Sequence, residues 1–263
     1  MKKTLRLLFS FLLLSAFVAS GWKVWQIVGA YARAEESYEE LTQFAQISAE
    51  PAENVESPQK ENSLEAPSLP TSEILWPQID FESLSAINPD VIGWIIIEDT
   101  NINYPVVQGE DNDFYLTHQF DKTKNRAGCL FLDIENDPDF ANQNQIIYGH
   151  YTKDKSMFYQ LRGYKQQDFY DAHPTGWLIT PSGGYRLHFF SGYVSSVEGD
   201  GWQTEFGGES FAKWLSARRS KSLFKSDVNP TEEDAVLTLS TCSYEFDNAR
   251  FVLHAVMEDL TTP

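Results

Sequence analysis

The sequence predicts a mainly β fold, a closed barrel or a sandwich, for the part of the chain from residue 76 onward. Short runs of apolar and β-branched residues recur there, and turn-rich segments separate them. Few segments have apolar residues at helical spacing, which favours a barrel or sandwich over a parallel sheet covered by helices. The predicted strands cover residues 91–97, 129–132, 145–148, 176–180, 185–193, 235–241 and 251–257.

The first thirty residues have the composition of an export signal or a membrane anchor. Lys2, Lys3 and Arg6 precede an apolar block at 7–22, and apolar residues continue beyond Lys23. This continuation favours a retained single-pass anchor in the cell membrane, with a cleaved signal as the alternative. The basic residues before the block predict a cytoplasmic N-terminus and an extracellular position for the rest of the chain.

Residues 31–75 form an acidic segment between this anchor and the predicted β domain. They contain ten glutamates against Arg33 and Lys60, a net charge of −8. Residues 51–72 are rich in Pro, Ser, Glu and Asn and lack aromatic side chains. Such a composition predicts a largely disordered linker. The expected organisation is therefore a cytoplasmic tip and anchor at 1–30, a linker at 31–75 and a globular domain at 76–263.

The charge of the chain restricts its partners. The net charge is −18 at pH 7, and residues 76–263 account for −14 of it. Nucleic acid and anionic membrane surfaces would be repelled by such a domain, so nucleic acid is not an expected partner. A basic peptide or an amine substrate would be attracted.

A cysteine and an arginine flank the last predicted turn. The run Ala235-Val-Leu-Thr-Leu-Ser-Thr-Cys242 ends in a thiol, a polar turn covers 243–249, and Arg250 begins the next apolar run. This pattern predicts a hairpin that brings Cys242 and Arg250 side by side. The pair suits covalent acyl chemistry, because a thiolate attacks a carbonyl carbon and a guanidinium can stabilise the oxygen that becomes negative.

His150 is the best candidate for a proton carrier among the five histidines. It follows the strand-like run 145–148 and Gly149, which is expected to permit a sharp exit from the strand. His188 and His254 lie inside predicted strands, and the other two histidines, His118 and His173, lie in polar loops. An ordinary loop histidine remains the alternative for His150.

The second cysteine, Cys129, has two interpretations. A disulfide with Cys242 is the structural alternative in an exported protein, but it would leave Arg250 without a role. We expect instead a small buried side chain at Cys129. The cysteines and histidines are not clustered at metal-binding spacing, so neither a metal nor another cofactor is expected.

Several motifs together resemble a known family. Thr238-Leu-Ser-Thr-Cys242 with Arg250, and Tyr148-Gly-His150, are similar to the sortases, the membrane-anchored cysteine transpeptidases of Gram-positive bacteria. Class B is the closer match, and the similarity extends from about residue 79 to 257. Its further motifs occur in order at Asn88-Pro-Asp-Val-Ile-Gly-Trp94, Tyr104-Pro-Val-Val-Gln-Gly109, Asp111-Asn-Asp-Phe-Tyr-Leu116 and Ala127-Gly-Cys-Leu-Phe-Leu-Asp133.

The resemblance implies a fold and a set of residue roles. The fold would be an eight-stranded sortase-type β-barrel with an N-terminal helix near Phe81 to Ile87 and a helix in the late insertion that contains residues 211–223. Independently of the resemblance, the place of that insertion between two late predicted strands indicates that it forms a wall beside the site. Cys242 would be the nucleophile, His150 the acid and then the base, and Arg250 the group that orients substrate and stabilises the oxyanion. Asn112, Leu116 and Ser240 would lie near the substrate groove.

The implied reaction has two protein or peptide substrates. The C-terminal sorting signal of an exported protein, of Asn-Pro-x-Thr or a related type, would be cleaved and held as a thioester on Cys242. The acyl group would then pass to an amine of a peptidoglycan precursor or of a pilin lysine. Two alternatives stay open: a secreted cysteine endopeptidase that releases its product to water, and a non-catalytic surface-interaction module.

Overall fold

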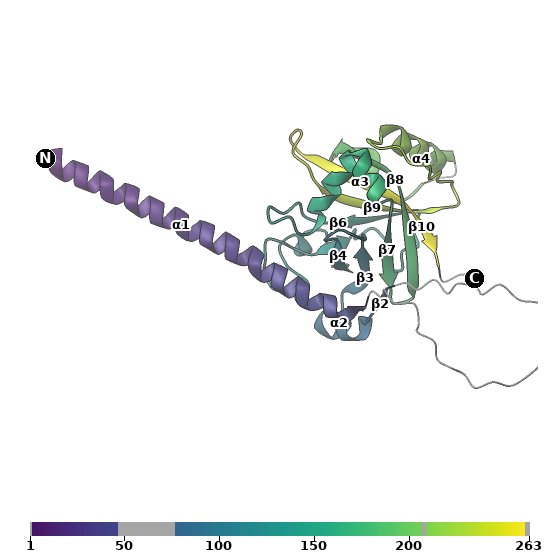
Figure 1. Ribbon diagram of the computed structural model, residues 1–263, viewed down its shortest axis with the longest axis horizontal. Coiled ribbons are helices and arrows are strands. Elements are labelled where there is room, and N and C mark those ends of the chain that lie inside the picture. Colours follow the sequence, from purple (N-terminus) through teal and green to yellow (C-terminus); the bar gives the residue numbers. More distant parts are fainter. Residues whose placement is uncertain (1, 47–76, 207–208, 261–263) are drawn as a thin grey trace, which may run out of the picture.

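Eight strands form a closed β-barrel in the computed structural model, which describes residues 2–46, 77–206 and 209–260 (Figure 1). The strands are hydrogen-bonded in the order β10-β8-β7-β3-β4-β5-β6-β9, and pairing of β9 with β10 closes the barrel. The pairs β4–β5 and β6–β9 are parallel. The strand bounds are β3 (Val91–Ile96), β4 (Asn103–Val107), β5 (Leu130–Leu132), β6 (Asn144–Tyr148), β7 (Thr175–Thr180), β8 (Gly183–Ser196), β9 (Ala235–Cys242) and β10 (Ala249–Asp259).

The predicted barrel is thereby confirmed, and seven of its strands are those expected from the sequence. The eighth, β4, was not among the predicted strands. Its interior contains Pro105, which lacks a backbone N–H and usually argues against a central strand. In the structure Pro105 nevertheless lies within β4, where it is paired with Trp94 of β3.

The strand that ends in Cys242 is covered on both faces. Leu237 and Leu239 belong to the main core, whereas Val236 belongs to a second buried cluster with Phe211 and Trp214. The last two residues lie on α4 (Glu209–Lys221), the helix predicted in the late insertion. Because α4 covers the outer side of the barrel, residues 236–241 of β9 are all buried, and the strand forms a rigid base for the residue at its end.

The shorter helices connect the strands. The predicted helix near Phe81 to Ile87 is α2 (Phe81–Ile87), and the side chain of Asp80 caps it by accepting a hydrogen bond from the Ser83 N–H at 3.0 Å. The remaining helical segments are η2 (Phe114–Leu116), η3 (Phe158–Lys165), α3 (Gln167–Ala172) and η4 (Asp200–Trp202).

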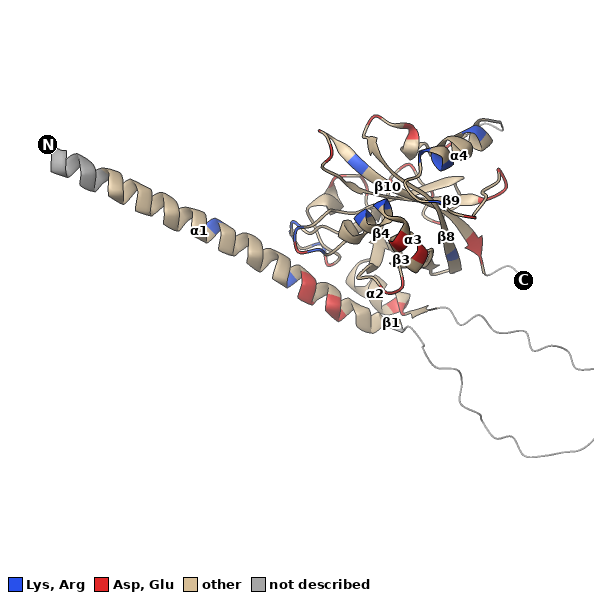
Figure 2. Cartoon of the chain, turned by 45° about the horizontal axis from the view of Figure 1, so that its top comes forward, with Lys and Arg blue, Asp and Glu red and all other residues tan. Residues whose placement is uncertain are grey.

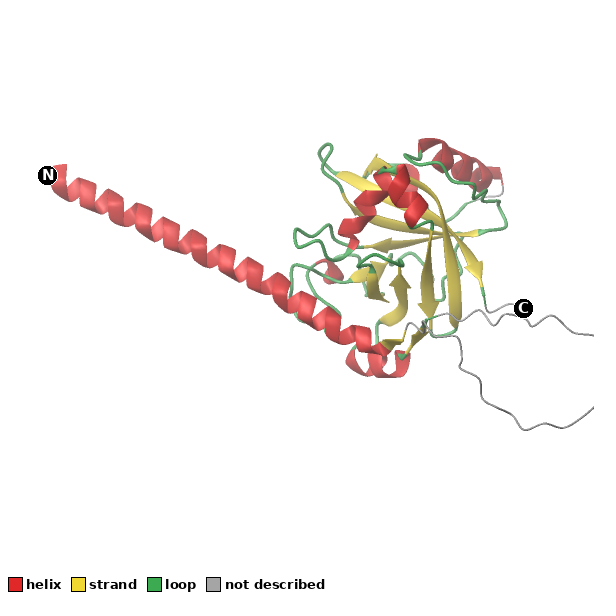
Figure 3. Cartoon of the chain, viewed as in Figure 1, coloured by secondary structure: helices red, strands yellow, loops and turns green. Residues whose placement is uncertain are grey.

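A long helix, α1 (Lys2–Leu41), extends away from the barrel (Figures 1 and 3). Within it, an 18-residue stretch has a mean hydropathy of 1.5, and the apolar side chains from Phe9 to Val28 are exposed. The helix is thus a candidate membrane span by length and composition. Figure 2 shows acidic residues concentrated near its barrel-proximal end.

The helix continues through the first part of the predicted linker. It is followed by η1 (Thr42–Phe44) and by β1 (Ala45–Gln46), which pairs with β2 (Gln78–Ile79) in a separate two-stranded sheet. The remainder of the predicted linker, residues 47–75, lies outside the described residues.

Candidate active site

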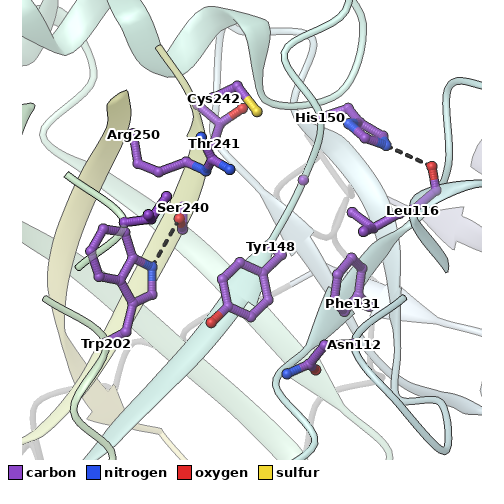
Figure 4. A pocket seen from close by; sticks show the side chains of 12 residues that line it. Asn112, Leu116, Phe131, Tyr148, His150, Trp202, Ser240, Thr241, Cys242 and Arg250 are labelled. Carbon is purple, nitrogen blue, oxygen red and sulfur yellow. Dashed lines mark hydrogen bonds between the residues drawn. The ribbon is translucent and has the colours of Figure 1, made fainter. Parts of the chain in front are cut away.

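A pocket of about 490 Å³ opens at one end of the barrel (Figure 4). Strands β6 and β9, the start of β10 and the loops beside them supply its walls. All six residues predicted from the sequence line it. Its lining residues are Asn112, Leu116, Phe131, Tyr148, Gly149, His150, Val197, Trp202, Ser240, Thr241, Cys242 and Arg250.

Cys242 and Arg250 are directly opposed in the antiparallel pair of β9 and β10. The turn between them is closed by a hydrogen bond from the Ser243 N–H to the Ala249 carbonyl at 2.9 Å. Asn248 adopts a φ of 60°, a left-handed conformation that asparagine tolerates better than most residues. The hairpin predicted from the sequence is therefore present, and it brings the thiol and the guanidinium to the same end of the pocket.

The turn after Cys242 is also held by charged and polar groups. The Lys165 ammonium donates to Ser243 Oγ at 3.0 Å and forms an ion pair with Glu245. Hydrogen bonds from Lys165 and then from Ser243 lower the pKa of Glu245 to about 2. These contacts tie the turn to η3.

His150 lies across the pocket from Arg250, just beyond the end of β6 (Figure 4). Its Nε2 donates to the Leu116 carbonyl at 2.7 Å, so Nδ1 is the nitrogen without a proton in the neutral ring. The Cys242 sulfur points toward the side of the pocket on which His150 lies. This arrangement leaves Nδ1 to accept or donate a proton during a reaction.

Gly149 is required for a different reason from the one expected. A Cβ at this position would overlap Leu130 Cδ2 and would lie 2.5 Å from Phe158 Cδ2. The glycine that adopts a positive φ in the described residues is Gly128, not Gly149. Close packing of the strand end against Leu130 and Phe158, rather than a sharp backbone exit, therefore explains Gly149.

The three predicted groove residues differ in what they offer a ligand. Leu116 exposes apolar surface. Ser240 is buried, and its hydroxyl accepts a hydrogen bond from Trp202 Nε1 at 3.1 Å. The Asn112 side chain is engaged by the protein, since its Oδ1 accepts from the Ile134 N–H at 2.9 Å and its Nδ2 lies 3.3 Å from an Asp133 carboxylate oxygen.

Trp202 is a pocket residue that the sequence did not reveal. It lies on η4 in the insertion between β8 and β9. Arg218 on α4 is fully buried and binds the Asp200 carboxylate through both terminal nitrogens, at 2.5 and 2.6 Å. Trp214 Nε1 also donates to the Asp200 carbonyl at 2.6 Å. None of the residues 211–223, which were predicted to form a wall beside the site, lines the pocket; Trp202, earlier in the same insertion, does so, and α4 supports it from behind.

Tyr148 and Thr241 complete the polar lining. The Tyr148 hydroxyl donates to Asp133 at 2.7 Å, and burial together with this carboxylate raises the pKa of Tyr148 well above its usual range. Thr241 Oγ1 is buried and has no hydrogen-bond partner within the described residues. Because that oxygen is buried, a ligand in the pocket does not reach it without a local rearrangement.

Both cysteines are free thiols. Cys129 is 1% exposed, and burial raises its pKa to about 12. The disulfide alternative is absent from the structure, and Cys129 has the buried position expected of it. Cys242 is the partly exposed one of the two thiols.

The described residues contain no group of three or more His, Cys, Asp or Glu side chains that could hold a metal ion.

Buried His254 is unsuited to proton transfer at neutral pH, because burial lowers its pKa to about 3. Of the five histidines, His150 is the one that lines the pocket with Cys242.

Comparisons with known proteins give close relatives. The chain is 38% identical over 178 residues to sortase B of Staphylococcus aureus, covering 66% of this chain and 73% of the relative. It is 38% identical over 169 residues to sortase B of Listeria monocytogenes, covering 64% and 69%. A solved Staphylococcus aureus sortase B–substrate complex is 37% identical with a TM-score of 0.66, covering 68% of this chain and 85% of that chain. No family model matches the sequence.

Proposed function

The chain belongs to the sortase B family of cysteine transpeptidases, and we propose that it cleaves the sorting signal of an exported protein through a thioester on Cys242. The second substrate is an amine, from a peptidoglycan precursor or a pilin lysine. The observation that carries this proposal is the convergence of Cys242, His150 and Arg250 on one pocket. Transfer of an acyl group from one amine to another can use a thiol as nucleophile, an imidazole as proton carrier and a permanent cation that stabilises the oxyanion.

The first half of the reaction forms the thioester. The Cys242 thiolate attacks the carbonyl carbon of the scissile peptide bond, and the carbonyl oxygen becomes negative. Arg250, directly opposite Cys242 in the sheet, stabilises this charge. The intermediate collapses, the C–N bond breaks, and protonated His150 Nδ1 gives its proton to the departing amine.

The second half transfers the acyl group. The incoming amine attacks the thioester carbonyl while neutral His150 Nδ1 removes its proton. Collapse of the second tetrahedral intermediate breaks the C–S bond, forms the new amide and returns Cys242 as a thiolate. Throughout both halves the Nε2–H remains donated to the Leu116 carbonyl, which supports a single ring orientation.

The pocket shape supports an extended peptide as the first substrate. Leu116, Val197 and Trp202 present apolar surface along it, and Cys242 and Arg250 supply polar groups at one end. A sorting signal with apolar and small polar residues would contact both kinds of group. We therefore assign Leu116, Ser240 and Asn112 to the groove, with Asn112 and Ser240 acting mainly as supports because their polar atoms already bind the protein.

We also propose that α1 anchors the enzyme in the cell membrane with its N-terminus in the cytoplasm. Trp22 and Trp25 are exposed, and their ring centroids are 5.2 Å apart. Tryptophans of this kind favour the membrane–water interface. The basic residues before the apolar stretch support the same orientation, so the catalytic domain would face the cell exterior.

The experiment that tests the reaction follows product with and without an amine. The full chain in detergent would be incubated with a fluorescent Asn-Pro-x-Thr-type sorting peptide, alone or with a glycine peptide as acceptor. We expect an amide-linked product that increases with the amine and is lost in His150→Ala. A product that is always the free acid, at a rate independent of the amine, would instead indicate an endopeptidase. Absence of any turnover over a panel of sorting peptides would favour the non-catalytic alternative.

A further inference from the structure

The last turns of α1 are packed against the barrel. Ala34, Tyr38 and Leu41, spaced to lie on one face of the helix, are buried at 2%, 6% and 6% exposure. The Tyr38 ring also makes an edge contact with Tyr104, with centroids 5.3 Å apart. The same helix that carries the exposed apolar stretch therefore ends as a part of the folded domain (Figures 1 and 3).

Three hydrogen bonds join this helix end to the segment that we call the Leu116 loop, residues 113–129, and the longest of them runs from the Gln119 side-chain amide to Ser37 Oγ at 3.4 Å. The Tyr38 hydroxyl donates to the Gly128 carbonyl at 2.7 Å, in a buried position. The Asn125 side-chain amide donates to the Ala30 carbonyl at 2.9 Å. The two shorter bonds hold the loop near its C-terminal end, at positions of α1 that lie about two turns apart.

The Leu116 loop contacts the catalytic histidine. The Leu116 carbonyl accepts the hydrogen bond from His150 Nε2 at 2.7 Å, and the Cys129 N–H donates to the Tyr115 carbonyl at 3.0 Å, which draws the two ends of the loop together. The backbone of Gly128 is packed against the imidazole, since a Cβ built there would lie 2.9 Å from His150 Cδ2 and 3.2 Å from the Leu116 carbonyl oxygen. Gly128 therefore accepts a hydrogen bond from Tyr38 through its carbonyl, and it leaves no room for a side chain between its Cα and the His150 ring.

We propose that Tyr38 is a positioning residue for His150, so that the membrane-proximal end of α1 is part of the support of the catalytic site. This inference rests on the proposed role of His150. Gly128 holds a left-handed φ of 65°, and the Tyr38 hydroxyl stabilises the carbonyl of that same residue. Loss of the hydroxyl leaves a buried carbonyl without its donor, which favours rotation of the Gly128 peptide. Rotation displaces both the Gly128 backbone and the Leu116 carbonyl that orient the imidazole.

The continuity of α1 connects this support to the membrane. Val28 ends the exposed apolar stretch, and Tyr38 follows ten residues later on the same helix, which at about 1.5 Å per residue is roughly 15 Å. A bilayer-embedded helix therefore enters the catalytic domain directly instead of reaching it through a flexible tether. We therefore expect the anchor to affect the rate of chemistry as well as the location of the enzyme.

The test compares Tyr38→Phe with Tyr31→Phe in the full chain, both in detergent micelles. Tyr38→Phe keeps the ring and its packing against Tyr104 but removes the hydroxyl. Tyr31 lies on the same helix, is partly buried, and its hydroxyl forms no hydrogen bond within the described part of the chain, so it is the matched control. Unfolding temperatures of both variants would be measured first, and activity assayed well below them.

For Tyr38→Phe we expect kcat for transfer of a sorting peptide to a glycine peptide to fall about 5- to 20-fold, because small displacements of a catalytic group are costly. The KM for the sorting peptide should stay within about twofold, since the peptide pocket is untouched. Tyr31→Phe should behave as wild type. Wild-type kcat in Tyr38→Phe, or a rise in KM alone, would overturn the proposal.

A second readout does not require turnover. Side-chain ¹⁵N resonances of His150 report which ring nitrogen is protonated and whether the ring keeps one environment. We expect these resonances to shift or broaden in Tyr38→Phe and to stay unchanged in Tyr31→Phe. Unchanged His150 resonances in both variants would overturn the positioning role of Tyr38. This measurement needs no activity, so it remains decisive if the wild-type enzyme shows no transpeptidation. Lack of transpeptidation would count against the proposed function instead.

Discussion

Arg250 occupies the position directly opposite Cys242 in the pairing of β10 with β9. Side chains of directly opposed residues in an antiparallel pair leave the same face of the sheet with their Cβ atoms about 4.5–5.5 Å apart. A charge at this distance does not depend on a flexible loop for its position. The backbone of Arg250 is therefore fixed beside Cys242, as the proposed stabilisation of an oxyanion requires.

The first prediction concerns the shape of that cation. Arg250→Lys keeps the positive charge but replaces a planar fork with a single ammonium on a flexible stem. We expect kcat for peptide transfer to fall about 100-fold or more, in line with loss of one oxyanion donor. Alkylation of Cys242 by a small neutral reagent, which forms no oxyanion, serves as the control and should change much less. Near-normal kcat in the variant would show that charge alone is sufficient.

The second prediction concerns Gly128. Gly128→Ala places a Cβ 2.6 Å from the Tyr115 carbonyl oxygen and 2.9 Å from His150 Cδ2, at a φ of 65°. The left-handed conformation alone costs about 1–2 kcal/mol for a non-glycine residue. We expect a lower free energy of unfolding and a large fall in kcat. Gly21→Ala is the control, because nothing lies within 4 Å of the added methyl group.

The third prediction separates the two thiols. The pKa of Cys129 is raised to about 12 by burial, so this thiol stays protonated and inaccessible near pH 7. A methanethiosulfonate reagent should therefore label the native chain once, at Cys242, and label it twice only after unfolding. Mass spectrometry of the labelled peptides gives the site. Labelling of Cys242→Ala in the native state would contradict this description of Cys129.

The fourth prediction concerns pH and stability. Burial lowers the pKa of His254 to about 3, whereas an unfolded histidine titrates near 6.5. Below about pH 6 the unfolded chain binds a proton that the folded chain excludes, so the free energy of unfolding should fall as the pH decreases. The slope due to one such proton approaches about 1.4 kcal/mol per pH unit. The loss continues until the pH nears the folded pKa.

Denaturant unfolding at several pH values between 7 and 4 measures this slope. In His254→Gln the slope of the free energy of unfolding against pH should be smaller by the contribution of one proton. This expectation holds whatever the variant does to stability at pH 7. His188→Gln on the paired strand β8 is the control and should retain the His254 contribution. An identical slope in wild type and His254→Gln would show that His254 takes up its proton equally in the folded and the unfolded chain, which would contradict the lowered pKa.

Much of the catalytic site was accessible from the sequence because it lies at strand ends. An apolar run that stops at Cys242, a polar turn and a new apolar run at Arg250 determine a hairpin, and the hairpin determines the pair. His150 is recognisable in the same way, as the residue beyond a strand and a glycine. Local pattern and chemistry coincide at these three positions.

The residues that were missed depend on contacts between distant segments. Trp202 is held at the pocket because Arg218 on α4 binds Asp200 on the same short helix as Trp202. No periodic pattern in the sequence predicts that contact. Strand β4 was not predicted because it contains Pro105, and proline is rarely found in central strands. The docking of α1 left a weak signal: Ala34, Tyr38 and Leu41 share one helical face among the glutamates, although the acidic composition indicated a solvated linker.

The most direct test of the central claim is intact-mass spectrometry of the full chain after brief incubation with a sorting peptide and no amine. We predict an adduct with the mass of the acyl portion of the peptide, located on Cys242, removed by hydroxylamine or a glycine peptide and absent from Cys242→Ala. Transfer to the glycine peptide by Cys242→Ala at the wild-type rate, or an adduct on any other residue, would contradict the account.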